Sequence, residues 1–152
     1  MAFGLKLMQV PALVEVIFVT VFVVVLCVVV HYEALSRLTS LLKRIHIEPR
    51  PRILLLIFSI LLTHIGEIWI FGGAYFYLDS SDRHGSLLAD HPIGLFDCIY
   101  FSAVCFTTLG LGDIVPTGPV RFMTGTEALT GFVLIAWSAS FTFVEMQRFW
   151  KQ

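Results

Sequence analysis

The chain has 152 residues, of which 57% are hydrophobic and only 14% charged, and its formal net charge is −1. Soluble domains carry about a quarter charged residues, so this balance excludes an ordinary soluble protein, and the near-neutral charge gives no sign of nucleic-acid binding. We expect an all-α integral membrane protein. The cysteines have neither metal-ligand nor disulfide spacing and are expected to be small buried side chains. They are Cys27, Cys98 and Cys105.

Residues 1–32 form the first predicted element, a transmembrane helix running from about residue 10 to 30. Its core, VIFVTVFVVVLCVVV, is rich in β-branched residues, but its length and continuity favour a membrane helix over a strand. One lysine, Lys6, precedes the apolar run, and no small-residue cleavage site follows it. We therefore interpret the segment as a retained helix and not as a signal peptide.

The second predicted element covers residues 33–50, where the spacing of apolar residues predicts a separate amphipathic helix over 33–46. Its apolar side chains recur at helical spacing, at Ala34, Leu35, Leu38, Leu41, Leu42 and Ile45. Polar side chains fall largely on the other side, at Arg37, Ser40, Lys43 and Arg44. Such a helix is expected to lie flat in the interface against membrane lipids, before Pro49 and Pro51 turn the chain into the next span. The alternative is a plain cytosolic linker helix.

Residues 51–152 contain two further predicted spans, an outer helix at 53–78 and an inner helix at 120–147. Between them lies LFDCIYFSAVCFT, residues 95–107, which is too short to cross a bilayer. Because it joins two spans that must face opposite ways, it is predicted to enter and leave on one side as a re-entrant half-helix. Asp97 suits the positive end of its helix dipole, and the negative end, at Thr107, points toward the membrane interior.

Charge predicts the orientation of the chain in the membrane. The connection between the first two spans holds five basic residues and is expected to be cytoplasmic. The connection after the second span is mostly acidic and would be external. The N-terminus is then outside the cell, and the C-terminus, with Arg148 and Lys151, is cytoplasmic.

The segment TTLGLGD, residues 107–113, follows the half-helix directly. Irregular backbone at membrane depth is tolerated only where protein or a water-filled cavity satisfies it, so the segment is expected to line a pore or a buried site. Gly110 and Gly112 can adopt positive φ, and their alternation with Leu109 and Leu111 lets consecutive carbonyls point the same way. A row of carbonyl oxygens suits a dehydrated alkali cation, and nothing in the stretch favours a transition metal.

This pattern resembles the selectivity filter of potassium channels, T-V-G-Y-G-D, and residues 53–147 are similar to the pore domain of small prokaryotic-type members with one re-entrant pore loop per chain. The resemblance implies K⁺ sites at the carbonyls of Thr108, Leu109, Gly110 and Leu111, with the Thr108 hydroxyl as one more ligand. It makes Gly112 the outermost filter glycine and Asp113 the acid that attracts cations to the external mouth. Filter support is implied for Tyr100, Phe101 and Thr107, and an inner-helix hinge for Gly131.

One chain supplies one filter segment, whereas the family closes its ring of carbonyls with four. The resemblance therefore implies a homotetramer in the plasma (inner) membrane that conducts K⁺ passively, without a cofactor, nucleic acid or enzymatic chemistry. Leu111 stands where the family mostly has tyrosine or phenylalanine, so a non-selective Na⁺/K⁺ channel is an alternative. The others are a non-conducting regulatory channel subunit and a membrane metal enzyme that would use Glu15, His31, His64 and Glu67.

Ionisable side chains inside the predicted spans are costly and often functional. His64 and Glu67 lie one helical turn apart, and we expect either a pH-sensitive gating element or a mutually satisfied pair, since a metal site has too few visible partners. Glu127 either braces the filter from behind or pairs with Arg121. Helical spacing on the inner helix makes four residues candidates for lining the ion cavity, unless that face packs on the second span: Val133, Ala136, Ser140 and Val144.

Overall fold

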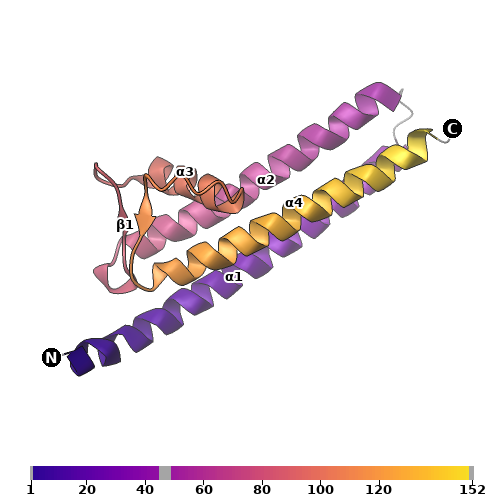
Figure 1. Ribbon diagram of the computed structural model, residues 1–152. Helices are drawn as coiled ribbons and strands as arrows, with labels where there is room; N and C mark the ends of the chain where they lie inside the picture. The colour runs from indigo at the N-terminus through magenta and orange to yellow at the C-terminus, as the bar shows by residue number, and fades with distance from the viewer. Residues whose placement is uncertain (1, 45–48, 151–152) are drawn as a thin grey trace.

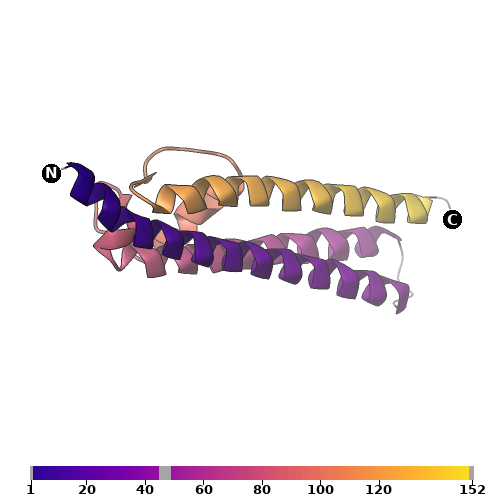
Figure 2. The ribbon, with the colours of Figure 1, turned by 90° about the horizontal axis from the view of Figure 1, so that it is seen from below.

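The computed structural model describes residues 2–44 and 49–150, and within them the chain forms four α-helices (Figure 1). They are α1 (Ala2–Arg44), α2 (Pro49–Asp79), α3 (Leu95–Phe106) and α4 (Val120–Trp150). The helices α1, α2 and α4 are long and apolar enough to cross a membrane, and they run side by side (Figures 1 and 2). The three predicted spans are confirmed, and the chain is an all-α, multi-pass membrane protein.

The first helix is longer than predicted. Residues 33–44 do not form a separate interfacial helix, because α1 continues through them as one helix of 43 residues. No glycine or proline occurs between His31 and Arg44 to interrupt it. Its apolar stripe contacts the other spans in place of lipid: Leu35, Leu38 and Leu42 cluster with Leu56 and Ile60, and Phe141 packs against them. Residues 45–48, including Ile45 of the predicted stripe, lie outside the described residues.

The second helix begins at Pro49, four residues before the predicted start of the outer span, and α4 ends at Trp150, three residues after the predicted end. The start of α1 lies at the end of the bundle that carries α3, and the end of α4 lies at the opposite end (Figure 1). The two termini of the described chain therefore lie at opposite ends of the bundle. Which end faces the cytoplasm stays a prediction.

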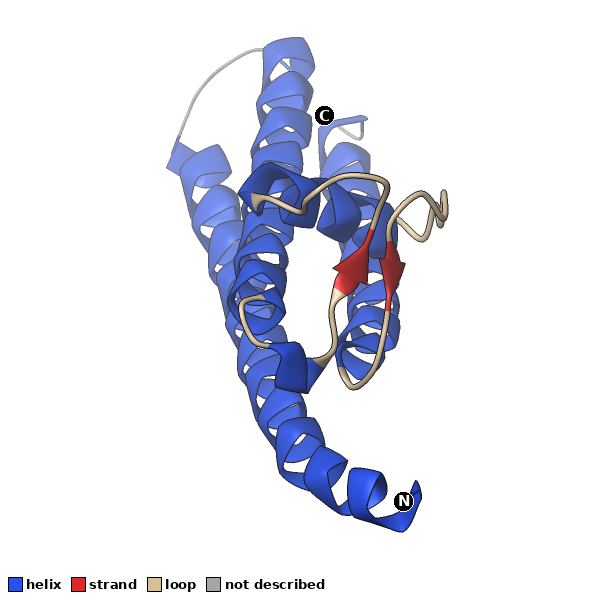
Figure 3. Cartoon of the chain, turned by 90° about the vertical axis from the view of Figure 1, so that its left-hand side faces the viewer, coloured by secondary structure: helices blue, strands red, loops and turns tan. Residues whose placement is uncertain are grey.

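Short elements close the connection between α2 and α4 into a loop at one end of the bundle (Figure 3). A 3₁₀ helix, η1 (Asp82–His84), follows α2, and strand β1 (Leu87–Leu88) pairs antiparallel with β2 (Val115–Pro116). Next to the strands, the Thr117 N–H donates to the Ser86 carbonyl at 2.9 Å, and the Ser86 N–H donates to Thr117 Oγ1 at 3.2 Å. Residues 89–114, including α3, are thus held at both ends.

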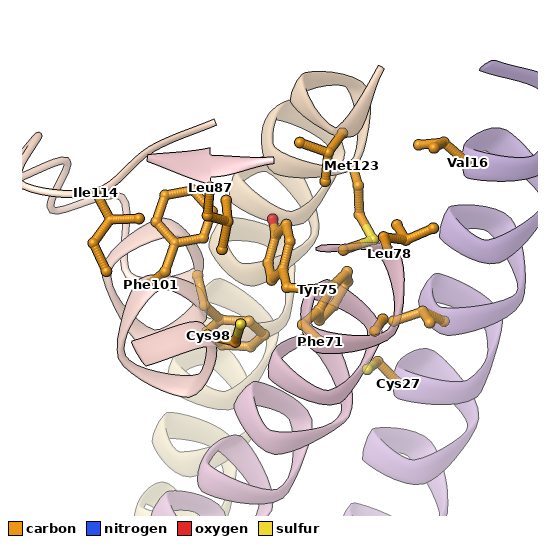
Figure 4. Close-up of a cluster of buried hydrophobic side chains, with 14 of the residues drawn as sticks. Val16, Cys27, Phe71, Tyr75, Leu78, Leu87, Cys98, Phe101, Ile114 and Met123 are labelled. Carbon is orange, nitrogen blue, oxygen red and sulfur yellow. The ribbon is translucent and has the colours of Figure 1, made fainter. Parts of the chain in front are cut away.

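The larger hydrophobic cluster lies where α3 packs against the three spans (Figure 4). Its members come from all four helices and include Val16, Cys27, Phe71, Tyr75, Leu78, Cys98, Phe101, Phe106 and Met123. The three cysteines are free thiols in or beside this cluster, as predicted. The backbones of α2 and α3 nearly touch, because a Cβ added to Gly72 would lie 2.8 Å from the Ile99 Cα. This packing fixes where α3 sits on the bundle.

Candidate functional site

The start of α3 is fixed by the side chain of Asp97. The Gly94 N–H donates to Asp97 Oδ2 at 2.8 Å, and His91 Nε2 lies 3.1 Å from Asp97 Oδ1. The carboxylate therefore binds an N–H group that the helix itself leaves without a partner, at the positive end of the dipole. The position predicted for Asp97 is confirmed.

Asp97 gives α3 a dependence on pH. The hydrogen bond from the Gly94 N–H, followed by that from His91, lowers the pKa of the Asp97 carboxyl below its ordinary value of 3.8. Because the folded-state pKa is the lower one, its stabilisation is present above about pH 4 and is lost as pH falls through the folded-state pKa. Asp97→Asn is expected to lower the midpoint of thermal unfolding near pH 7 and to match the wild type in acid. Unfolding of both proteins across pH measures this, with Asp90→Asn, exposed in the same connection, as the control. A gap that persists in acid would contradict the assignment.

The other end of α3 abuts the middle of α4. A Cβ added to Gly131 would lie 2.1 Å from the Phe106 carbonyl oxygen and 2.9 Å from the Phe106 Cα. The glycine for which the resemblance implied a hinge is therefore a point of close backbone contact, and its role as a hinge stays a prediction. The chain leaves α3 at this contact. The Thr108 N–H donates a hydrogen bond to the Cys105 carbonyl, and the Leu109 N–H donates one to the Val104 carbonyl, each at 2.9 Å.

Residues 108–113, called the TLGLGD loop from here on, follow this contact with a repeating backbone conformation. The angle φ is positive at Thr108 (58°), Gly110 (62°) and Gly112 (82°), and not at the leucines between them. A left-handed residue at every second position breaks the up-and-down alternation of carbonyls that an extended strand has. Thr108 adopts it despite its Cβ, which costs roughly 1–2 kcal/mol. All six residues are exposed in the single chain.

The residues predicted to support this loop have different contacts. The Tyr100 hydroxyl donates to Asp113 Oδ2 at 2.7 Å, which links α3 to the end of the loop. Phe101 is buried and packs edge-on against Tyr75 of α2, with the ring centroids 5.0 Å apart. The Thr107 hydroxyl donates back to the Ala103 carbonyl at 2.7 Å and ends the helix. Within one chain, Tyr100 is the member of this group with a hydrogen bond to the loop.

Removing the Tyr100 hydroxyl tests that link. Tyr100→Phe is expected to loosen the end of the loop and, in the channel that the resemblance implies, to lower ion flux several-fold, with the unfolding midpoint unchanged. Asp113→Asn should have a similar effect, and the double variant should add little, because both changes break one bond. The measurement is flux into liposomes, with Tyr77→Phe, an exposed tyrosine of α2, as the matched control. Fully additive effects would mean that the two groups act separately.

A buried carboxylate lies behind α3. Glu127 of α4 is fully buried and accepts hydrogen bonds from the Tyr75 hydroxyl at 2.5 Å and from the Ser102 hydroxyl at 2.6 Å. Ser102 Oγ also lies 2.9 Å from the Ile68 carbonyl of α2. The hydrogen bonds that the structure describes for Glu127 therefore join α4 to α2 and α3. Of the two roles expected for Glu127, these contacts match bracing from behind and not pairing with Arg121.

The second buried carboxylate lies between two histidines. Glu67 Oε1 is 2.9 Å from His31 Nδ1, and Glu67 Oε2 is 2.8 Å from His64 Nδ1. His31 comes from α1, and its Nε2 lies 3.3 Å from the Ser138 hydroxyl of α4. The predicted satisfied pair is thus part of a network across three helices. The spacing around Glu67 gives no sign of His31, which is 36 residues away, and the pH-sensitive role of His64 and Glu67 stays a prediction.

The four candidate cavity residues of α4 share a free face of the single chain. Val133, Ala136, Ser140 and Val144 are all exposed. The opposite face, with Leu134 and Ser138, is buried against the other helices. The alternative, in which the candidate face packs on the second span, therefore does not describe the single chain. That these residues line an ion cavity stays a prediction.

No curated protein and no solved structure matches the chain. A family model described as "Ion channel" matches residues 53–148, which is more than half of the chain. The matched region runs from α2 through α3 and the TLGLGD loop into α4 and leaves out α1. The chain therefore belongs to this ion channel family.

Proposed function

We propose that four copies of this chain form a potassium channel in the plasma (inner) membrane, with the TLGLGD loop as its selectivity filter. The observation that carries the proposal is the positive φ at every second residue of the loop, directly after a half-helix. This backbone favours carbonyls on one side, which is what a dehydrated cation needs in place of its water shell. Membership in the ion channel family supports conduction in general.

The exposed surface of the single chain supports a homotetramer. Leu109 and Leu111 expose 62% and 58% of their surface. Exposed apolar side chains on this scale fit burial against other subunits, and a closed ring of four loops around an axis provides it. The free face of α4 would then line the path below the ring, with Val133, Ala136, Ser140 and Val144 small enough for a hydrated ion.

In this channel, K⁺ moves passively between adjacent carbonyl sites. The sites are formed by Thr108, Leu109, Gly110 and Leu111, and the exposed Asp113 carboxylate raises the local concentration of cations at the outer mouth. The carbonyl end of α3 points toward the cavity and stabilises an ion waiting there. The N-terminus would lie outside and the C-terminus in the cytoplasm.

A non-selective Na⁺/K⁺ channel is the second candidate, and Leu111 favours it. Leucine keeps the backbone carbonyl but has no ring or hydroxyl to brace the loop from behind. A loop without this brace can adapt its carbonyls to the smaller Na⁺.

Flux into liposomes that contain only the purified full chain tests the proposal. We expect barium-blocked K⁺ flux, little Na⁺ flux and a particle with four-fold symmetry. Equal flux of both ions would overturn K⁺ selectivity in favour of the second candidate. Folded tetramers without flux of either ion would indicate a regulatory subunit or a closed gate. That result would contradict the proposal that this chain conducts K⁺ by itself.

Two variants make the test specific to the loop. Gly110→Ala should abolish flux, because alanine rarely adopts the φ of 62° that Gly110 has in the loop. A clash within the single chain is not the reason, since a Cβ at this position meets no atom within 4 Å. Leu111→Tyr should increase the preference for K⁺ over Na⁺ if the missing ring weakens selectivity. Leu88→Tyr, at an exposed leucine of β1, is the matched control and should change neither.

A further inference from the structure

One cluster of ionisable side chains lies inside the membrane and outside the TLGLGD loop. His31 and Glu67 are fully buried, and the His64 side chain is 14% exposed. The rings of His31 and His64 are stacked, with centroids 5.4 Å apart. Each imidazole presents its Nδ1 to a different oxygen of the same carboxylate. The three side chains therefore converge on one point between α1 and α2.

The charge of this cluster favours a bound cation. When both imidazoles are neutral and each donates its Nδ1–H, Glu67 retains a full negative charge inside the bilayer. Apart from stacking on each other, the described ring contacts of the histidines are His31 with Trp137 and His64 with Phe106. His31 also has a polar contact with the Ser138 hydroxyl. A buried carboxylate with no lysine or arginine among these described contacts is costly in a medium of low dielectric constant. A positive charge at the carboxylate reduces that cost, and it comes either from a proton on one imidazole or from a bound cation.

The ligand atoms select the class of cation. Alkali and alkaline-earth ions prefer six or more oxygen ligands, whereas two imidazoles with one carboxylate suit zinc and its neighbours among the transition metals. The potential ligand atoms of His31, His64 and Glu67 all lie within 4.8 Å of one another. Ligands of a tetrahedral zinc ion are about 3.3 Å apart, so small side-chain rotations are sufficient to bring them to one ion.

The surroundings of the cluster provide a supporting contact for a bound metal ion. When His31 binds a metal through Nδ1, its proton sits on Nε2, which lies 3.3 Å from the Ser138 hydroxyl and can donate to it. His64 borders a groove of about 490 Å³ between α2 and α4, lined also by Ser138 and Thr142. Most of the side chains that line this groove are apolar, and a water molecule beside the Ser138 hydroxyl would complete the fourth coordination position.

We propose that His31, His64 and Glu67 bind one zinc-class divalent cation per chain. The bound ion ties α1 to α2 beside Phe106, whose ring centroid lies 5.7 Å from that of His64 at the end of α3. The site thus joins α1, which lies outside the matched ion channel region, to Phe106, two residues before the TLGLGD loop. It does not depend on which ion the loop conducts.

Metal binding to the full chain in detergent tests the site directly. Metal-stripped protein is titrated with Co²⁺, whose visible spectrum reports tetrahedral coordination, and Zn²⁺ then displaces it. We expect one tetrahedral ion per chain and a rise in the unfolding midpoint on adding Zn²⁺. His31→Ala and His64→Ala should each weaken binding by more than about 100-fold, which exceeds the range for supporting contacts. A chain that binds no ion, or both variants binding like the wild type, would overturn the proposal.

Three further variants separate the site from misfolding and from thiol binding. Ser138→Ala leaves the ligands in place and should weaken binding about 10-fold. Cys27→Ala, one turn from His31 on α1, should leave binding unchanged. His64→Cys exchanges one ligand for a thiolate and should bind Co²⁺ with a new sulfur-to-metal absorption band. A folded His64→Cys protein without that band would count against the proposal even if the alanine variants failed to fold.

Discussion

Replacing Gly131 with alanine is expected to inactivate the channel and destabilise the fold by about 2–4 kcal/mol. The added methyl group would lie 2.1 Å from the Phe106 carbonyl oxygen, in the backbone of α3. No side-chain rotation relieves this clash, so α3 and α4 must separate, and overpacking of a core typically costs 1–3 kcal/mol even when neighbours can move. The separation displaces the start of the TLGLGD loop. Unfolding in detergent and flux into liposomes measure the two effects.

Gly125→Ala is the matched control for Gly131→Ala. Gly125 lies on the same helix, and a Cβ there meets no atom within 4 Å in the single chain. Since alanine has the higher helix propensity, this variant should be neutral or slightly stabilising. If Gly131→Ala behaved like Gly125→Ala, the close contact between α3 and α4 would not exist in the working protein. If it kept full stability but lost flux alone, the hinge interpretation would gain over close packing.

Glu127→Ala is expected to have the second large effect, a loss of about 3 kcal/mol of stability and most of the ion flux. The change removes the acceptor to which the Tyr75 and Ser102 hydroxyls donate at 2.5 and 2.6 Å. The Ser102 hydroxyl retains the Ile68 carbonyl at 2.9 Å, whereas the Tyr75 hydroxyl retains the weaker contact with Thr124 Oγ1 at 3.4 Å. An unsatisfied buried hydroxyl costs about 1–3 kcal/mol, so most of the loss falls on Tyr75. Because Ser102 lies on α3, the loss should loosen α3 and the loop that follows it.

The control for Glu127→Ala is Glu145→Ala on the same helix. Glu145 is also nearly buried, at 4% exposure, but its partner Arg148 is 58% exposed and can extend into water when the pair is broken. Its loss should therefore cost less than about 1 kcal/mol and leave flux intact. Glu127→Gln, which keeps the size of the side chain, should fall between the two. Equal effects of Glu127→Ala and Glu145→Ala would show that the contacts with α3 do not matter for conduction.

Hydropathy and length were sufficient to predict the spans and the half-helix. A run of 20 or more apolar residues has few alternatives, and the 12-residue α3 is too short to cross. The same reasoning misassigned residues 33–44. A stripe such as Leu35, Leu38 and Leu42 has the same spacing whether it faces lipid or a neighbouring helix. Only the partners, Leu56 and Ile60 of α2, distinguish the two, and spacing along one helix cannot supply them.

The candidate site shows the same division between local and distant information. The positive φ of Gly110 and Gly112 follows from the residue type, and the capping role of Asp97 follows from its position in the first turn. The contacts of the buried carboxylates are not local. Glu127 is 52 residues from Tyr75 and 25 from Ser102, and these distances in sequence carry no signal in a single chain. The hinge expected at Gly131 rested on the conformational freedom of glycine, which is a property of the residue type. Its close contact with Phe106 depends on where α3 ends, and the local sequence does not show this.

The length of α1 has a consequence for how the protein sits in its bilayer. Its candidate span, Val10–Arg44, has 35 residues and is about 52 Å long, which exceeds the roughly 30 Å of a hydrocarbon core. Val16 packs in the cluster around α3, while Leu42 packs in the cluster at the other end of the bundle. One continuous helix therefore connects the two clusters. A change in the tilt of α1 would therefore displace both clusters together.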